Sequence, residues 1–152
     1  GRGRYRVTEE AQRVLGCRPY SNFNLVGAAQ VGKSSLTGMR VLHRLAGKLP
    51  VWPFDPLPAS GSVVVEIYTT IAALAAGRSA GRSKMLSINA LNQALANLGS
   101  APVHGEGAID DHRSDALLTA AWLRHVAHDP ALWDPRGLDA VRHTEGWTFG
   151  AR

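Results

Sequence analysis

Side chains that can bind metal are concentrated in one short stretch of the chain. Residues 110–115 read Asp-Asp-His-Arg-Ser-Asp and run directly into the helix-favouring stretch Ala-Leu-Leu-Thr-Ala-Ala-Trp. Carboxylate oxygens are the ligands that Mg²⁺ and similar hard cations prefer. In a helix, positions i, i+4, i+7 and i+11 lie on one face, and here these positions are Asp111, Asp115, Leu118 and Trp122. We therefore predict a helix from about residue 110 to residue 128 on which acidic and core side chains share a face.

A further carboxylate lies in an apolar segment. Ser62-Val-Val-Val-Glu66-Ile-Tyr68 is rich in β-branched residues, which predicts a buried strand over residues 63–68. A charged group in such a strand needs a partner, because burying an unpaired carboxylate is costly. Glu66 is therefore a candidate to act together with the acidic helix.

Simpler roles exist for some of these residues. Asp110 and Asp111 could cap the helix and complement its dipole, a contribution of about 0.5–2 kcal/mol for a cap. Asp115 lies beyond the cap, which favours a ligand role. His112 is either a direct ligand or a surface residue near the site, and the remaining histidines show no ligand spacing.

The elements that must position these side chains alternate in type. Helices are expected over residues 8–15, with Thr8 as the cap, and over residues 34–45, with a stop at Gly47. Two more helices are expected over residues 70–76 and 86–98. Four prolines after residue 49 place residues 51–54 in a short edge strand or loop. The predicted class is α/β, in a single domain.

A phosphate-binding motif competes with the acidic helix as the functional centre. Gly27-Ala-Ala-Gln-Val-Gly-Lys33-Ser34 matches the pattern G-x-x-x-x-G-K-[ST] and precedes an expected helix. In a true P-loop, backbone N–H groups cradle phosphates, Lys33 reaches the β- and γ-phosphates, and Ser34 helps to hold magnesium. The motif also needs a buried strand before it, whereas residues 23–26 are short and include Asn24. The alternative interpretation is a glycine-rich turn with a serine helix cap.

Composition limits the class of protein. The chain has 152 residues with 45% hydrophobic residues, one cysteine, a net charge of +5, and a pI near 10.0. No signal peptide is visible, no apolar run reaches the roughly 20 residues that span a bilayer, and Cys17 has no disulfide partner. These features predict a soluble cytoplasmic protein. Two basic clusters could meet phosphate backbones or could be ordinary solvated surface: Arg2, Arg4, Arg6 and Arg78, Arg82, Lys84.

The order of segments resembles a known family. The segments that carry the resemblance are residues 30–38, Val51-Trp-Pro-Phe-Asp55, Val64-Val-Glu-Ile-Tyr68, Asp110–Leu117 and Glu145-Gly-Trp147. Together they resemble domain-of-unknown-function family 429, over roughly residues 20–150. That family is described as predicted nucleases with a ribonuclease-H-like fold. The resemblance implies a mixed sheet with flanking helices, and residues 1–20 would be an N-terminal extension.

The same resemblance implies a site and a chemistry. Holliday-junction resolvases of the wider ribonuclease-H-like group have a glutamate on an apolar strand, and their last helix has an Asp preceded by a further acid or His. Glu66 and Asp115 match these positions, and His112 or Asp111 would be the companion, with Asp110 a further candidate. Such sites hold two Mg²⁺ or Mn²⁺ ions and hydrolyse phosphodiesters of nucleic acid.

One family feature is missing. The first strand of that fold normally supplies an essential Asp, and the only Asp in residues 1–60 is Asp55, in a proline-rich stretch. The resemblance therefore implies the C-terminal part of a longer domain, which would be inactive alone. A non-catalytic relative of the fold, whose acids only stabilise the helix end, is the remaining alternative.

Overall fold

The protein is helical. A computed structural model describes residues 4–27 and 29–152. Within these ranges the chain forms six α-helices and two short 3₁₀ helices, and β-pairing is limited to isolated bridges. The predicted α/β class, with a ribonuclease-H-like mixed sheet, is therefore wrong. The chain divides into two compact units, one running to Glu66 and resuming at Trp133–Arg152, the other spanning Ile67–Leu132.

The first unit holds α1 (Val7–Val14), α2 (Val31–Leu45) and the short α6 (Leu138–Val141). Its core contains an aromatic cluster in which Trp52, Trp133 and Phe149 lie with ring centroids 4.6–5.8 Å apart. The Trp52 indole N–H donates to the Trp133 carbonyl oxygen at 3.2 Å, so the buried polar atom is satisfied. Trp147 is also buried. The aromatic residues thus connect the middle of this unit to its C-terminal segment.

The predicted strand over residues 63–68 does not form. Val64 pairs with Val51 and Glu66 pairs with Thr148, each as a single parallel bridge. Trp52 N donates to the Val64 oxygen, and Val64 N donates to the Pro50 oxygen, both at 2.9 Å. On one side the ladder stops because Pro50 has no N–H to continue it. On the other side the chain turns, and Asp55 N donates to the Val51 oxygen at 3.0 Å. β-Branched residues favour extended backbone, and the segment is extended, but a strand needs a neighbour of similar length.

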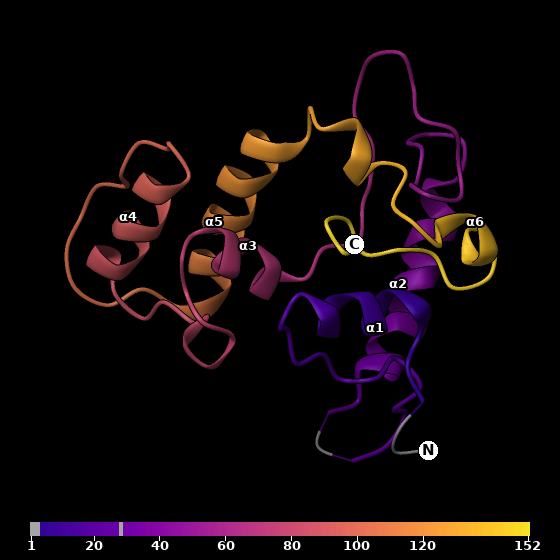
Figure 1. Cartoon of the computed structure of the whole chain (residues 1–152), viewed down its shortest axis with the longest axis horizontal. Helices are drawn as coiled ribbons and strands as arrows, with labels where there is room; N and C mark the ends of the chain where they lie inside the picture. The colour runs from indigo at the N-terminus through magenta and orange to yellow at the C-terminus, as the bar shows by residue number, and fades with distance from the viewer. Residues whose placement is uncertain (1–3, 28) are drawn as a thin grey trace. The chain divides into compact units, whose positions relative to one another are not determined.

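The second unit is built around α5 (Asp111–Val126). This helix packs against α3 (Thr69–Ala75) and α4 (Ile88–Asn97), as the orange and pink ribbons of Figure 1 show. Two 3₁₀ turns, η1 (Ala80–Arg82) and η2 (Pro130–Leu132), complete the unit. Its core contains Ile71, Met85, Leu91, Leu95, Leu118 and Trp122. Burial of Leu118 and Trp122 sets the rotation of α5 and hence the direction of its acidic residues.

Some ends of the helices follow local signals and others do not. Gly16 and Gly47 follow α1 and α2 with φ of 87° and 75°, so the predicted glycine stops are confirmed. Ser87 caps α4 by accepting from Ala90 N at 3.2 Å. Thr8, predicted to cap the first helix, lies inside α1 instead. Its buried hydroxyl oxygen accepts from Thr148 N at 2.9 Å, a tertiary bond that local sequence does not reveal.

None of the helices in the described ranges is long and apolar enough to cross a membrane.

Candidate functional site

The first acid of the cluster is a helix cap. Asp110 precedes α5, and its side chain accepts from Arg113 N at 2.9 Å. The Arg113 guanidinium lies 3.6 Å from the same carboxylate, in an exposed pair. Asp110 therefore satisfies one of the free N–H groups at the start of the helix, as its position predicts.

Asp111 is the most unusual carboxylate of the second unit. One of its oxygens, Oδ2, accepts an ion-paired hydrogen bond from Lys84 Nζ. The other, Oδ1, is buried and has no hydrogen-bond partner among the described residues. A buried carboxylate oxygen without a partner is costly, because it has lost water and gained nothing in exchange. A cation or a donor at Oδ1 would remove that cost.

Asp115 lies one turn after Asp111 on the same face of α5. Burial, followed by the negative charge of Asp111, raises the pKa of Asp115 above its ordinary value. A hydrogen bond from the Thr69 side chain and the charges of Lys84 and His112 act in the opposite direction without cancelling the effect. Side chains at i and i+4 have Cβ atoms about 5–6 Å apart, so the two carboxylates repel each other. The positive charge around Asp111 and Asp115 does not balance their negative charge.

Lys84 and Thr69 complete this group, which we call the α5 acid site: Asp111, Asp115, Lys84 and Thr69. All four residues belong to the second unit. Asp111 raises the pKa of Lys84 through its hydrogen bond and charge, so the ammonium stays protonated. Lys84 was visible in the sequence only as part of a basic cluster, because the loop that carries it to Asp111 has no periodic pattern. Thr69 was not identified by sequence reasoning at all.

His112 is exposed on α5, and it influences Asp115 only through its charge. The described residues contain no group of three or more His, Cys, Asp or Glu side chains placed to hold a metal ion. Mg²⁺, however, is commonly held by one or two carboxylates, with water and substrate phosphate completing its shell. The unpartnered Asp111 Oδ1 and the adjacent Asp115 fit that kind of binding.

Glu66 has a different environment, in the first unit. The Arg6 guanidinium donates to both of its oxygens, at 2.6 and 2.9 Å, and Thr148 Oγ1 donates at 2.7 Å. Burial alone would raise the pKa of Glu66, but the hydrogen bonds and charge of Arg6, with the Thr148 bond, hold it below its ordinary value. The partner that a carboxylate in this segment requires is thus an arginine.

Arg6, one member of the first basic cluster, is not a free surface cation. Its side chain is buried and is shared between Glu66 and Glu9, with Nε 3.0 Å from Glu9 Oε1. The sequence predicted that this cluster could contact phosphates or could be solvated surface. Of its other members, Arg4 is exposed and Arg2 lies outside the described residues. Only the acid three residues after Arg6 hints at this role in the sequence.

The glycine-rich motif adopts a turn followed by a helix. Its Ala28 lies outside the described residues. The N–H groups of Val31, Lys33 and Ser34 donate to carbonyl oxygens of residues 29 and 30, and Gly32 N donates to the Asn24 oxygen at 3.2 Å. These are donors that a P-loop would direct at phosphate. The residues before them, 23–26, form no strand. The backbone therefore agrees with the alternative interpretation in leading from a loop into α2, but the predicted serine cap is wrong. The helix begins at Val31 after Gln30, and Ser34 lies inside it rather than at its cap.

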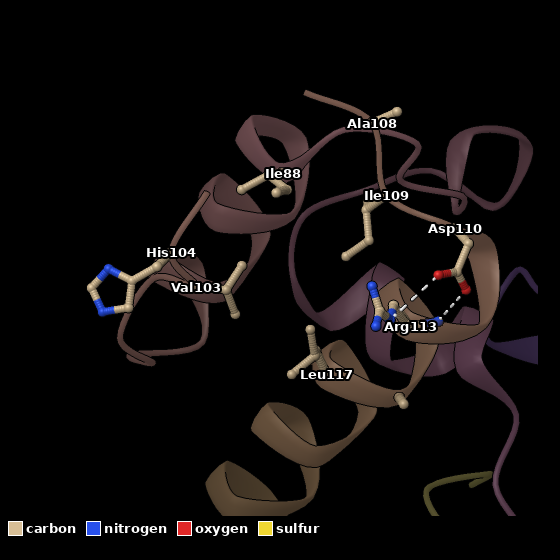
Figure 2. A pocket seen from close by; sticks show the side chains of 9 residues that line it. Ile88, Val103, His104, Ala108, Ile109, Asp110, Arg113 and Leu117 are labelled. Carbon is tan, nitrogen blue, oxygen red and sulfur yellow. Dashed lines mark hydrogen bonds and ion pairs between the residues drawn. The ribbon is translucent and has the colours of Figure 1, made fainter. Parts of the chain in front are cut away.

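A pocket of about 540 Å³ lies on another face of α5. Figure 2 shows its lining, with Ile109 and Leu117 near the Asp110–Arg113 pair and the His104 ring directed away from the other labelled side chains. Asp110, Arg113 and Leu117 are spaced i, i+3 and i+7, whereas Asp111 and Asp115 follow the face of Leu118. The pocket is therefore separate from the α5 acid site.

Comparisons with family models, with curated proteins and with solved structures find no match to this chain.

Proposed function

We propose that the chain is a metal-dependent hydrolase of phosphodiesters in nucleic acid and that the α5 acid site carries the reaction. The observation that carries the proposal is the buried, unpartnered Asp111 Oδ1 beside Asp115. Mg²⁺ or Mn²⁺, when bound, would supply Lewis-acid stabilisation of the phosphate and would activate water.

The roles of the side chains follow from their environments. Asp111 would hold the cation through Oδ1. Asp115, whose pKa is raised, is suited to accept the proton of the water whose oxygen attacks phosphorus. As the P–O ester bond breaks, the Lys84 ammonium would stabilise charge on the phosphate, and the leaving oxygen would take a proton from solvent. Glu66, neutralised by Arg6 and Thr148, is assigned a structural role.

The test is cleavage of fluorescently labelled single-stranded and duplex DNA and RNA with Mn²⁺ or Mg²⁺. Asp111→Asn and Asp115→Asn should each lower the rate about 10²–10⁴-fold, the usual contribution of a positioned acid–base group. The matched control is Asp110→Asn, one residue away, which keeps the cap and should retain activity. Calorimetry should show Mn²⁺ binding that weakens in Asp111→Asn.

Two results would count against the proposal. Metal-dependent cleavage that survives both substitutions would place the chemistry elsewhere. Absence of both cleavage and Mn²⁺ binding in the wild type would instead indicate that the acids serve only the structure of the second unit.

A further inference from the structure

Helix α2 carries a row of cations on one side. Lys33, Arg40 and Arg44 are spaced i, i+7 and i+11, which places them within about 40° of one another around the helix. With a rise of 1.5 Å per residue the row extends about 16 Å along the axis. All three residues are exposed. We call them the α2 basic row.

No acid neutralises this row. Residues 11–54 contain no Asp or Glu. Within the part of the chain that the structure describes, no ion pair involves Lys33, Arg40 or Arg44, whereas Arg6, Arg13 and Arg142 each have acidic partners. Exposed cations fixed on one helix and lacking counter-charges produce a local positive potential.

The side of α2 opposite the basic row is partly buried. Val31, Leu42 and Leu45 lie on that side by helical spacing, and Leu42 and Leu45 are half-buried. Gly32 is buried, and a Cβ at this position would lie 2.1 Å from the Asn22 carbonyl oxygen, so the backbone of α2 is closely packed there. Leu42 and Leu45 are thus the partly buried residues opposite the row, Val31 is exposed, and the three cations of the row face solvent.

We propose that the α2 basic row is a docking surface for the sugar-phosphate backbone of nucleic acid. The sugar-phosphate backbone carries regularly spaced negative charges, and a straight row of cations can contact several of these phosphates at once. Arginine adds bidentate hydrogen bonds to phosphate oxygens. The contacts would be independent of base sequence. The choice of polyanion rests on the proposed function, while the surface itself rests on the geometry of α2.

The test is fluorescence anisotropy with a labelled 20-base-pair duplex in EDTA, which prevents cleavage, at 50–200 mM NaCl. The variant Lys33→Gln/Arg40→Gln/Arg44→Gln should bind at least about 10-fold more weakly. Its slope of log affinity against log salt should be shallower by about 2–3, because each phosphate contact contributes about 0.9. The charge-conserving variant Lys33→Arg/Arg40→Lys/Arg44→Lys should keep the salt slope and should bind more tightly than the glutamine variant.

A matched control removes the same charge elsewhere. Arg124→Gln/Arg136→Gln/Arg152→Gln replaces three exposed arginines outside the named basic clusters, lowers the net charge equally and should bind nearly as well as the wild type. Equal losses in both triple variants would overturn the inference, since net charge alone would then explain binding. Binding of phosphatidylserine vesicles in place of duplex, lost on removing the row, would also overturn it by identifying a lipid surface as the partner.

The two proposals fail in distinguishable ways. Asp111→Asn/Asp115→Asn should abolish cleavage while leaving duplex binding in EDTA intact. If the wild type binds duplex through the row but cleaves nothing, the docking surface stands and the hydrolase proposal fails. If it hydrolyses bis(p-nitrophenyl) phosphate but does not bind duplex, the inference fails and the hydrolytic site stands.

Discussion

At the scale of single residues, the four acids singled out in the sequence have three different roles, because Asp111 and Asp115 share one site. Asp110 caps a helix, Glu66 is held by an arginine, and Asp115 lies in a site short of positive charge. The residue types are similar, so their environment decides what each can do. Each environment gives a distinct response to substitution and to pH.

Asp115→Asn should stabilise the fold at neutral pH. The pKa of Asp115 is raised in the folded state, so ionisation costs more there than in the unfolded chain, and that penalty develops as pH rises through the folded pKa. We expect a gain of about 0.5 kcal/mol at pH 7, because the carboxylate is partly solvated. Thermal unfolding measured from pH 3 to pH 8 should show the variant's advantage disappearing at low pH. An advantage that is independent of pH would contradict this explanation.

Glu66→Gln should destabilise the protein by about 1–2 kcal/mol. This is less than the loss expected for a fully buried ion pair, because the Glu66 side chain is 44% exposed. The pKa of Glu66 is lowered on folding, so its stabilising effect is complete above the ordinary carboxyl range and is lost as pH falls through the folded pKa. Denaturant titrations at pH 7 and pH 3 would measure both effects. Glu10→Gln, in an exposed pair with Arg13, is the control and should change little.

At the scale of elements, helices were predictable and the strand was not. Residues 86–98 and 110–128 carry apolar spacing and capping residues within their own segments, and both became helices, α4 and α5. Residues 63–68 have the composition of a strand, yet their pairing depends on distant segments, and near Val51 it ends at Pro50 and at a turn. The same distinction applies to the site. The shared face of Asp111 and Asp115 follows from helical spacing, whereas Lys84 reaches Asp111 through an irregular loop.

The cap of α5 provides a test at this scale. Asp110→Ala should cost about 1 kcal/mol of unfolding free energy, because Arg113 N loses its acceptor at 2.9 Å. Asp110→Asn should cost only a few tenths, since asparagine is an equally good cap. Chemical denaturation of the two variants would show the difference, and equal losses would mean that charge, rather than the cap bond, is responsible.

At the scale of the whole molecule, the two compact units have separate cores. Trp52 packs against Trp133 and Phe149 in the first, and Leu91 is fully buried in the second. Trp52→Ala and Leu91→Ala should each cost about 2–5 kcal/mol, since both remove buried side chains. Native-state hydrogen exchange should show each substitution lowering protection chiefly within its own unit. Equal loss across the whole chain after either change would show that the units unfold as one.

The contacts of Arg6 set a practical limit on how short the chain can be made. Its guanidinium meets Glu9, Glu66 and the carbonyl oxygen of Glu145, so one residue near the beginning joins the middle and the end of the sequence. A version beginning at Val7 would leave Glu66 with only the Thr148 hydroxyl and would leave the buried Glu9 carboxylate without its cation. Deletions from the front should therefore stop before residue 6.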